Sequence, residues 1–305
     1  ASTGATEGGG VGEVAMPDFD VVEPTSVSEA CVLLAEDPDG SVVFAGGTDI
    51  LVDLKAGLKQ YRRLVSLARI EELEGLEIGA DGGLTIGAMT RVNQVARHRG
   101  IGERFRGIHE AAMSLAAEQV RNQATVAGNL CMAVPSADMA PILLAHGAAL
   151  RAVSPAGERS VALREFFVGP RETVLSPAEV VVALEVPAPA PGTGDASLRQ
   201  GGRVSLSLPM AAAAAVVVMD GDRFRDAAVA LGAVAPTPIL APSAGEAVEG
   251  KELSEEVLRE AGEKAAEATS PIDDLRASKE YRLELVKVLT RRVLLAAAER
   301  AQEKF

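Results

Sequence analysis

The stretch VFAGGTDI, from Val43 to Ile50, places a glycine pair directly after a short apolar run. Glycine has no Cβ, so its backbone can adopt a positive φ and can come close to a ligand. Successive N–H groups in such a turn can converge on phosphate oxygens, and Thr48 adds a hydroxyl donor. The stretch is neither a Walker loop nor a G-x-G-x-x-G fingerprint. It predicts either a phosphate-binding turn or a plain tight turn between a strand and a helix.

A second glycine-containing segment, 121–141, has the sequence RNQATVAGNLCMAVPSADMAP. It offers small residues, a threonine hydroxyl, asparagine amides and one carboxylate, that of Asp138. A carboxylate can accept hydrogen bonds from sugar hydroxyls, as the acidic residue of dinucleotide-binding folds does. The stretch 120–141 shows no helical period, which predicts a functional loop. The alternative is a surface loop in which Asp138 caps a helix that begins at Met139.

Helix and strand patterns alternate on both sides of these segments. The predicted elements are a helix at 28–37, strands at 41–45, 64–67, 76–78 and 84–88, and helices from about 91 and at 103–119. Ser26 or Ser28 is the expected N-cap of the first helix. The turn Asp81-Gly82-Gly83 joins two of the strands into a predicted hairpin.

The segment 187–202, PAPAPGTGDASLRQGG, is rich in proline and glycine and predicts a boundary between two domains. We expect the first domain at 16–190, with two subdomains split near residue 70, and the second at 200–305. Residues 1–15 are small and glycine-rich, which is typical of a flexible extension. The second domain begins with long apolar strands near 206–219 and 225–234. Helices follow from Ser254, broken at Ser270-Pro271 and resuming near Asp273.

Composition excludes several classes of protein. The net charge of −13 opposes binding to nucleic acid or to anionic membrane surfaces. Cys31 and Cys131 are too few for a four-cysteine iron–sulfur cluster or a structural zinc, and three histidines without metal spacing make a catalytic metal improbable. Free thiols are typical of a reducing cytoplasm, and no apolar run is long enough to span a bilayer. We therefore expect a cytoplasmic protein without membrane insertion.

The ordered motifs resemble the flavin subunits of molybdenum hydroxylases, a family that includes carbon monoxide dehydrogenase medium chains and xanthine dehydrogenase flavin domains. The segments that carry the resemblance are AGGTDI at 45–50, TVAGN at 125–129, PSADMAP at 135–141, TIGAMTRVNQVARH at 85–98, FFVGPRETVLSPAEVVVALEVP at 166–187, LGAVAPTPILA at 231–241 and PIDDLRASKEYRLELVKVLTRR at 271–292. They extend over about residues 16–300. The resemblance implies an α+β fold: a two-subdomain FAD-binding domain of the vanillyl-alcohol-oxidase (PCMH) type, followed by a C-terminal α+β domain with a small antiparallel sheet and helices.

The same resemblance implies a noncovalent FAD site. Residues 43–50 and 125–129 would hold the pyrophosphate, Asp138 the ribityl or ribose hydroxyls, and Val181 the adenine side. Arg199 and Arg203 match basic positions near the flavin, where a cation stabilises an anionic reduced ring; the alternative for both is a solvated linker charge. The implied cofactor-binding residues are Val43, Phe44, Ala45, Gly46, Gly47, Thr48, Asp49, Ile50, Leu115, Thr125, Val126, Ala127, Gly128, Asn129, Asp138, Val181 and Arg199.

Three departures from the family pattern bear on this expectation. Ala127 replaces a glycine of the second loop, which predicts a slightly different backbone or phosphate approach. Leu115 stands where eukaryotic relatives place an aromatic residue over the flavin, and it cannot stack. A cysteine-rich insertion found in one branch of the family is absent, and His98, His109 and His146 match no flavin-attachment histidine.

By this resemblance the chain is an oxidoreductase subunit that carries electrons rather than one that acts on the organic substrate. A small partner subunit with [2Fe–2S] centres would supply electrons to FAD, and a large subunit would hold the molybdenum cofactor, in a dimer of heterotrimers. No catalytic side chain and no metal site are expected on this chain. The alternatives are a stand-alone FAD-dependent oxidoreductase and a nucleotide-binding assembly module without redox turnover.

Overall fold

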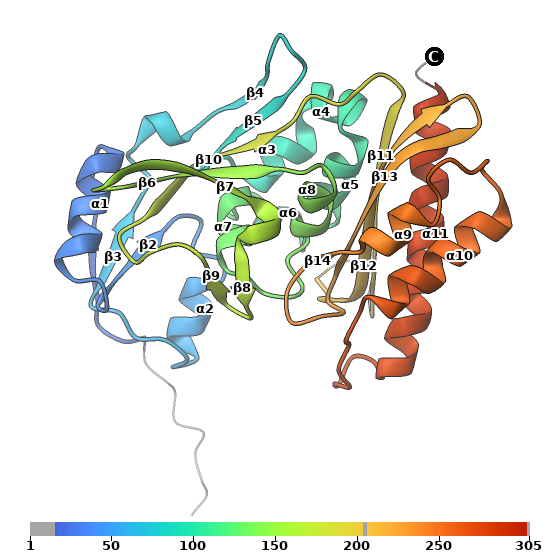
Figure 1. Ribbon diagram of the computed structural model, residues 1–305. Helices are drawn as coiled ribbons and strands as arrows, with labels where there is room; N and C mark the ends of the chain where they lie inside the picture. The colour runs from blue at the N-terminus through green and yellow to red at the C-terminus, as the bar shows by residue number, and fades with distance from the viewer. Residues whose placement is uncertain (1–15, 204–205, 304–305) are drawn as a thin grey trace, which may run out of the picture.

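A computed structural model describes residues 16–203 and 206–303 (Figure 1). The predicted flexible extension at 1–15 lies outside the described residues. The first elements of the chain form a parallel three-stranded sheet in the order β1-β3-β2. They are β1 (Asp20–Val22), α1 (Val27–Glu36), β2 (Ser41–Phe44), α2 (Ile50–Lys55) and β3 (Arg63–Ser66). Ser26 caps α1 by accepting a hydrogen bond from the Glu29 N–H at 3.2 Å, as one of the two candidate caps predicted.

A five-stranded antiparallel sheet follows in the order β4-β5-β10-β6-β7. Its strands are β4 (Leu76–Ile78), β5 (Leu84–Gly87), β6 (Ala149–Ser154), β7 (Gly157–Ala162) and β10 (Val180–Val186). The predicted hairpin is confirmed as β4 and β5. Smaller elements precede or edge this sheet: η1 (Glu71–Leu73), η2 (Leu163–Glu165), β8 (Phe167–Gly169) and β9 (Glu172–Thr173).

Six short helices fill the interval between β5 and β6. They are α3 (Val92–Arg97), α4 (Arg99–Arg104), α5 (Arg106–Ser114), α6 (Glu118–Arg121), α7 (Val126–Cys131) and α8 (Ala140–Ala145). The helix predicted at 103–119 is confirmed only at Arg106–Ser114, because the backbone turns at Phe105, whose ring is fully buried, and again at Ala116, whose φ is +42°. The long loop predicted at 120–141 is also wrong in part, since α7 lies within it.

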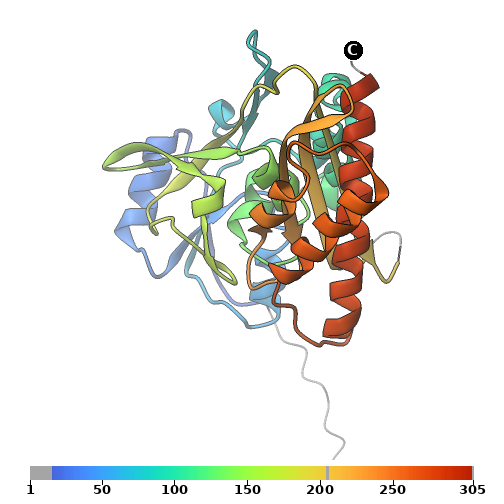
Figure 2. The same cartoon turned by 45° about the vertical axis from the view of Figure 1, so that its right-hand side comes forward.

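The C-terminal half forms a second antiparallel sheet covered on one side by helices (Figure 2). Its elements are β11 (Thr193–Gly201), β12 (Pro209–Asp220), β13 (Arg223–Gly232), β14 (Ile239–Leu240), α9 (Pro242–Glu246), α10 (Glu255–Glu267) and α11 (Lys279–Glu303). The linker predicted at 187–202 is wrong from residue 193 onward, where β11 pairs with β12. The last helix starts at Lys279 rather than near Asp273, and the Asp273 carboxylate instead accepts a hydrogen bond from the Lys279 N–H at 2.7 Å.

Two hydrophobic cores meet at the sheet of the C-terminal half. One extends through both N-terminal sheets and the short helices, and it also includes Ala214 of β12 and Ala230 of β13. The other lies between that sheet and α9, α10 and α11. Small residues let α11 come close, since a Cβ on Gly194 would sit 2.0 Å from the carbonyl oxygen of Ala297. In the described part of the chain, no helix is long and apolar enough to cross a membrane.

Candidate cofactor site

The turn after β2 lies against the segment that leads into α7. A Cβ on Gly46 would be 2.1 Å from the carbonyl oxygen of Gln123, so a side chain cannot fit there without a backbone shift. Gly47 has a φ of +73°, and a Cβ there would also meet the ring of Phe44 at 2.9 Å. The glycine pair therefore allows both the turn itself and its contact with the second segment.

The N–H groups of this turn are available to a ligand. Among the described residues, no protein acceptor pairs with the N–H of Gly46, Gly47, Thr48 or Asp49. The Thr48 hydroxyl donates only a long hydrogen bond, 3.4 Å, to the Asp49 carboxylate. A run of successive N–H groups without a protein acceptor suits an anion such as a phosphate. The turn therefore fits the phosphate-binding interpretation of the sequence.

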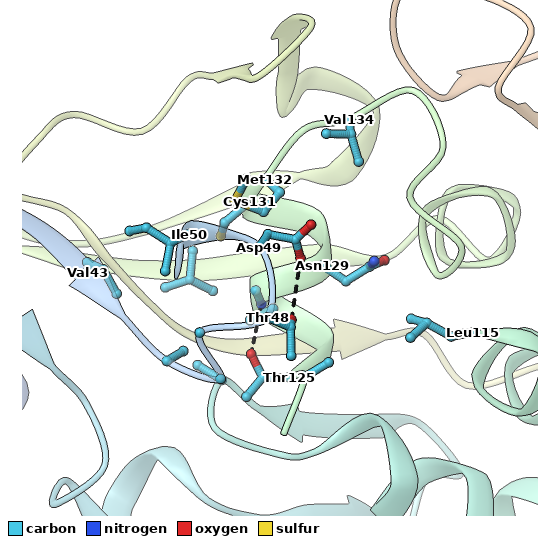
Figure 3. A pocket seen from close by; sticks show the side chains of 18 of the residues that line it. Val43, Thr48, Asp49, Ile50, Leu115, Thr125, Asn129, Cys131, Met132 and Val134 are labelled. Atoms are coloured by element: carbon cyan, nitrogen blue, oxygen red, sulfur yellow. Dashed lines mark hydrogen bonds between the residues drawn. The ribbon is translucent and has the colours of Figure 1, made fainter. Parts of the chain in front are cut away.

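The second segment is organised by Thr125. Its Oγ1 accepts a hydrogen bond from the Gly128 N–H at 3.0 Å and so caps α7 (Figure 3). Ala127 lies inside this helix and is not among the residues with a positive φ. Because the position is helical, alanine fits it without backbone strain.

A cavity of about 340 Å³ lies between the two segments. Most of the lining is apolar, with a few polar groups among it, as is typical of cofactor sites. Figure 3 shows Thr48, Thr125 and Asn129 among the labelled lining side chains, with Leu115, the residue after α5, at one side of the group. The predicted site residues that line the cavity are Val43, Ala45, Gly46, Gly47, Thr48, Asp49, Ile50, Leu115, Thr125, Ala127, Gly128, Asn129, Asp138 and Val181.

Three predicted site residues do not line this cavity. Phe44 packs behind Gly47, and Val126 is fully buried in the core. Arg199 is not among the lining residues, but it donates a hydrogen bond to Asp138, which is. Lining residues that the sequence interpretation missed include Cys131, Met132, Val134, Ser136, Glu179 and Leu208. Leu208 follows β11 and comes from the C-terminal half, and no motif in the sequence marks it.

Two protein families match the chain in succession. The family described as the FAD-binding domain in molybdopterin dehydrogenase matches residues 17–189. The carbon monoxide dehydrogenase flavoprotein C-terminal domain matches residues 196–297. The chain belongs to the FAD-binding subunits of the molybdopterin dehydrogenase family.

Relatives of this flavin subunit match over nearly their whole length. The xanthine dehydrogenase FAD-binding subunit of Escherichia coli O157:H7 is 32% identical over 280 residues, which cover 92% of this chain and 96% of the relative. The carbon monoxide dehydrogenase medium chain of Afipia carboxidovorans is 32% identical over 285 residues, or 93% of this chain and 98% of the relative. These similarities confirm the family predicted from the ordered motifs.

A solved structure shows the same fold. The carbon monoxide dehydrogenase of Hydrogenophaga pseudoflava that lacks the Mo-pyranopterin moiety contains a chain with a TM-score of 0.91 and 31% identity. The match covers 94% of this flavin subunit and 99% of that chain. The predicted α+β class, with an FAD-binding domain followed by a C-terminal domain, is confirmed.

The flavin subunit holds an unusual carboxylate at its cavity. Asp138 is largely shielded from solvent, and burial raises the pKa of its carboxyl group to about 6 even though Arg199 opposes the shift. The Arg199 Nη1 donates to Asp138 Oδ1 at 2.6 Å, and Nη2 donates to the Ser207 carbonyl oxygen. The proposed helix-capping role of Asp138 is wrong, since Met139 is the N-cap of α8 and no side chain caps it. Asp138 therefore faces the cavity as a hydrogen-bond acceptor.

The alternative of a solvated linker charge is wrong for Arg199, whose side chain is only 10% exposed. Arg203 is exposed, and its guanidinium donates a long hydrogen bond, 3.4 Å, to the Leu206 carbonyl oxygen. Leu115 follows α5 and is 5% exposed. Its carbonyl oxygen accepts a hydrogen bond from Arg121 at 2.9 Å, which fixes the backbone beside the cavity.

The thiols and histidines of the described residues form no metal site. Cys31 is buried, and burial raises the pKa of the Cys131 thiol to about 12, so neither is poised as a thiolate. Across residues 16–203 and 206–303, no cluster of His, Cys, Asp or Glu has the arrangement of a metal site. The cavity can hold a cofactor through N–H donors, hydroxyls, one carboxylate and apolar contacts.

Proposed function

We propose that this chain binds FAD noncovalently in the cavity and acts as the electron-transfer subunit of a molybdenum-containing dehydrogenase. The observation that carries the proposal is the run of unpaired N–H groups from Gly46 to Asp49 at the wall of the cavity. With the donors at the start of α7, it would bind the pyrophosphate. Asp138 would accept hydrogen bonds from ribityl or ribose hydroxyls, and Val181 would pack on the adenine side.

The isoalloxazine ring supplies the redox chemistry when FAD is bound, and the protein supplies its position and electrostatic surroundings. Leu115 would pack against the ring and exclude water without stacking. Arg199 would act through Asp138, because its guanidinium donates to that carboxylate and to the Ser207 carbonyl oxygen. This role differs from the direct flavin contact expected from the sequence.

The proposal includes the partners. The names of the relatives, medium chain and FAD-binding subunit, describe parts of larger enzymes. Electrons would originate at a molybdenum cofactor on a large subunit and pass through the [2Fe–2S] centres of a small subunit to FAD on this chain. From FAD they would leave for an external acceptor. We propose a dimer of such heterotrimers in the cytoplasm. The chain itself would divide into a domain at 16–190 and a second domain that starts at β11.

An absorbance spectrum of the chain, purified alone and with its partner subunits, tests this function. Flavin bands that the organic substrate bleaches only in the presence of the iron–sulfur and molybdenum subunits would support electron relay. Bleaching on the isolated chain would instead support a stand-alone oxidoreductase. If the purified chain shows no flavin bands and binds no added FAD, both redox functions are wrong.

A further inference from the structure

Strand β11 contacts both ends of helix α8 through charged side chains. Asp195 Oδ2 lies 2.9 Å from Nε2 of His146, the residue that ends α8. Four positions further along the strand, Arg199 pairs with Asp138, which immediately precedes the N-cap of α8. Asp138 and His146 thus flank the two ends of α8 (Ala140–Ala145). The strand therefore holds α8 at both ends.

The same strand also holds α5. Asp195 Oδ2 accepts a second hydrogen bond, 3.0 Å, from the Gly107 N–H in the first turn of α5. The Ser197 N–H donates to the Glu110 carboxylate at 3.1 Å. Because side chains of a strand alternate between its faces, residues 195, 197 and 199 all point toward these helices. Helix α5 leads directly into Leu115, and α8 begins directly after Asp138, so both cavity residues are placed by β11.

The pair between His146 and Asp195 is almost completely shielded from water, with side chains 4% and 3% exposed. Such a pair costs desolvation free energy, and well-packed apolar residues would often give equal stability. A hydrogen-bonded pair does, however, fix the direction and register of the elements that it joins. A pair that fixes the relative position of a helix and a strand also fixes the position of residues at the far end of that helix.

We propose that His146 and Asp195 are positioning residues of the FAD site: through α8 they set the place of the Asp138 carboxylate, and through α5 that of Leu115. This inference rests on the proposed FAD function. It assigns to the C-terminal domain a part in building a cofactor site whose recognisable motifs all lie in the N-terminal domain. Neither residue lines the cavity, so any effect on the cofactor must pass through the two helices.

The test compares FAD affinity across variants of the full chain, measured by quenching of flavin fluorescence. His146→Leu removes the hydrogen bond and should weaken FAD binding about tenfold, in the range seen when groups that orient ligands are lost. His146→Gln keeps a donor near the position of Nε2 and should restore binding to within about threefold of the starting protein. Glu260→Leu is the control: it removes the hydrogen bond from Lys251 to Glu260, at 2.8 Å, on α10, which packs on α9 and α11 rather than on α5 or α8, and should leave FAD affinity unchanged.

A double substitution separates positioning from general stability. If His146 acts through Asp138, His146→Leu should weaken binding much less in an Asp138→Asn background than alone. Equal effects in the two backgrounds, or normal FAD affinity in His146→Leu, would overturn the inference. If His146→Leu does not fold, Asp195→Asn, which keeps the shape of the side chain, replaces it with the same expected direction. Failure of the unsubstituted chain to bind FAD would instead refute the proposed function.

Discussion

Gly46 is the residue at which the two segments of the cavity touch, so its substitution has a predictable result. In Gly46→Ala the new methyl group would meet the Gln123 carbonyl oxygen at 2.1 Å, and one of the two backbones must move. We expect the free energy of unfolding to fall by about 1–3 kcal/mol, as for other overpacked sites, and FAD affinity to fall with it. Chemical denaturation and flavin titration measure the two effects.

Gly102→Ala is the matched control for that change. The nearest atom to a Cβ at Gly102 is Nδ1 of His109, at 3.8 Å, which is an ordinary contact. Because the position lies in α4, alanine should keep or raise stability, by up to about 1 kcal/mol. Equal behaviour of the two alanine variants would show that the close contact at Gly46 does not hold in solution.

Asp138 should give the stability of the protein a characteristic pH dependence. Burial raises the pKa of this carboxyl group from its ordinary 3.8 to about 6 in the folded chain. The folded state therefore holds the proton more tightly, so this contribution to stability is complete below the unfolded pKa and is lost as the pH rises through about 6. We expect a loss of about 2–3 kcal/mol from this group between about pH 4 and pH 6.

Urea denaturation of the unsubstituted chain and of Asp138→Asn at a series of pH values checks this expectation. The asparagine variant cannot titrate at this position, so the difference in unfolding free energy between the two chains should change across that interval. A difference that stays constant with pH would contradict the raised pKa.

The sequence predicts some of these residues and not others for a physical reason. A glycine pair after an apolar run meets a local need, a positive φ and a close approach of the backbone. It can therefore be recognised from a few neighbouring residues of the sequence. The pairing of Arg199 with Asp138 joins residues 61 positions apart and depends on tertiary structure. The charge of Arg199 was recognised as relevant, but its partner could not be derived from sequence spacing.

Helix α7 shows a similar limit for whole elements. It is six residues long, less than two full turns, so the sequence contains too little of a helical period to predict it. Helices this short depend on capping and tertiary contacts for their stability. By contrast, the long apolar run of β12 was predicted as a strand and is confirmed at Pro209–Asp220.

Thr125 provides the cap that α7 needs. Thr125→Ala removes the acceptor for the Gly128 N–H, and we expect about 1 kcal/mol of lost stability, the usual effect of losing an N-cap. FAD affinity should fall too, because the fraying turn belongs to the proposed pyrophosphate site. Thr125→Ser keeps the hydroxyl and should behave nearly as the unsubstituted chain in thermal unfolding and flavin titration. A serine variant as weak as the alanine variant would point to the methyl group rather than the cap.

At the scale of the whole molecule, the interval 187–202 predicts a domain boundary, whereas the structure forms β11 from residue 193 onward. Proline and glycine are dense before residue 193, and the following stretch contains Asp195, Ser197 and Arg199 at alternate positions. Their alternation with Ala196 and Leu198 is typical of a strand, but it covers only five residues beside the proline- and glycine-rich stretch. In the structure the side chains of Asp195 and Arg199 are nearly buried, because they meet charged and polar partners on α5 and α8. The boundary prediction rests on proline and glycine content, and the partners that bury these polar side chains depend on tertiary structure.

Arg300 joins the two halves directly. From α11 it donates to the Glu110 carboxylate on α5 and, at 2.6 Å, to the Asp195 carbonyl oxygen on β11. The Arg300 and Glu110 side chains are 15% and 28% exposed. Arg300→Met would leave the carboxylate partly buried without its cation, which we expect to lower the free energy of unfolding by about 2 kcal/mol.

Arg223→Met is the matched control, because Arg223 also pairs with a glutamate, Glu252, but both side chains are more than half exposed. Exposed pairs contribute little, so this variant should stay within about 0.5 kcal/mol of the unsubstituted chain. Calorimetry adds a second readout: if Arg300 couples the halves, its loss should broaden or split the unfolding transition, whereas Arg223→Met should leave its shape unchanged. A sharp single transition with unchanged stability in Arg300→Met would mean that apolar packing alone joins the two halves.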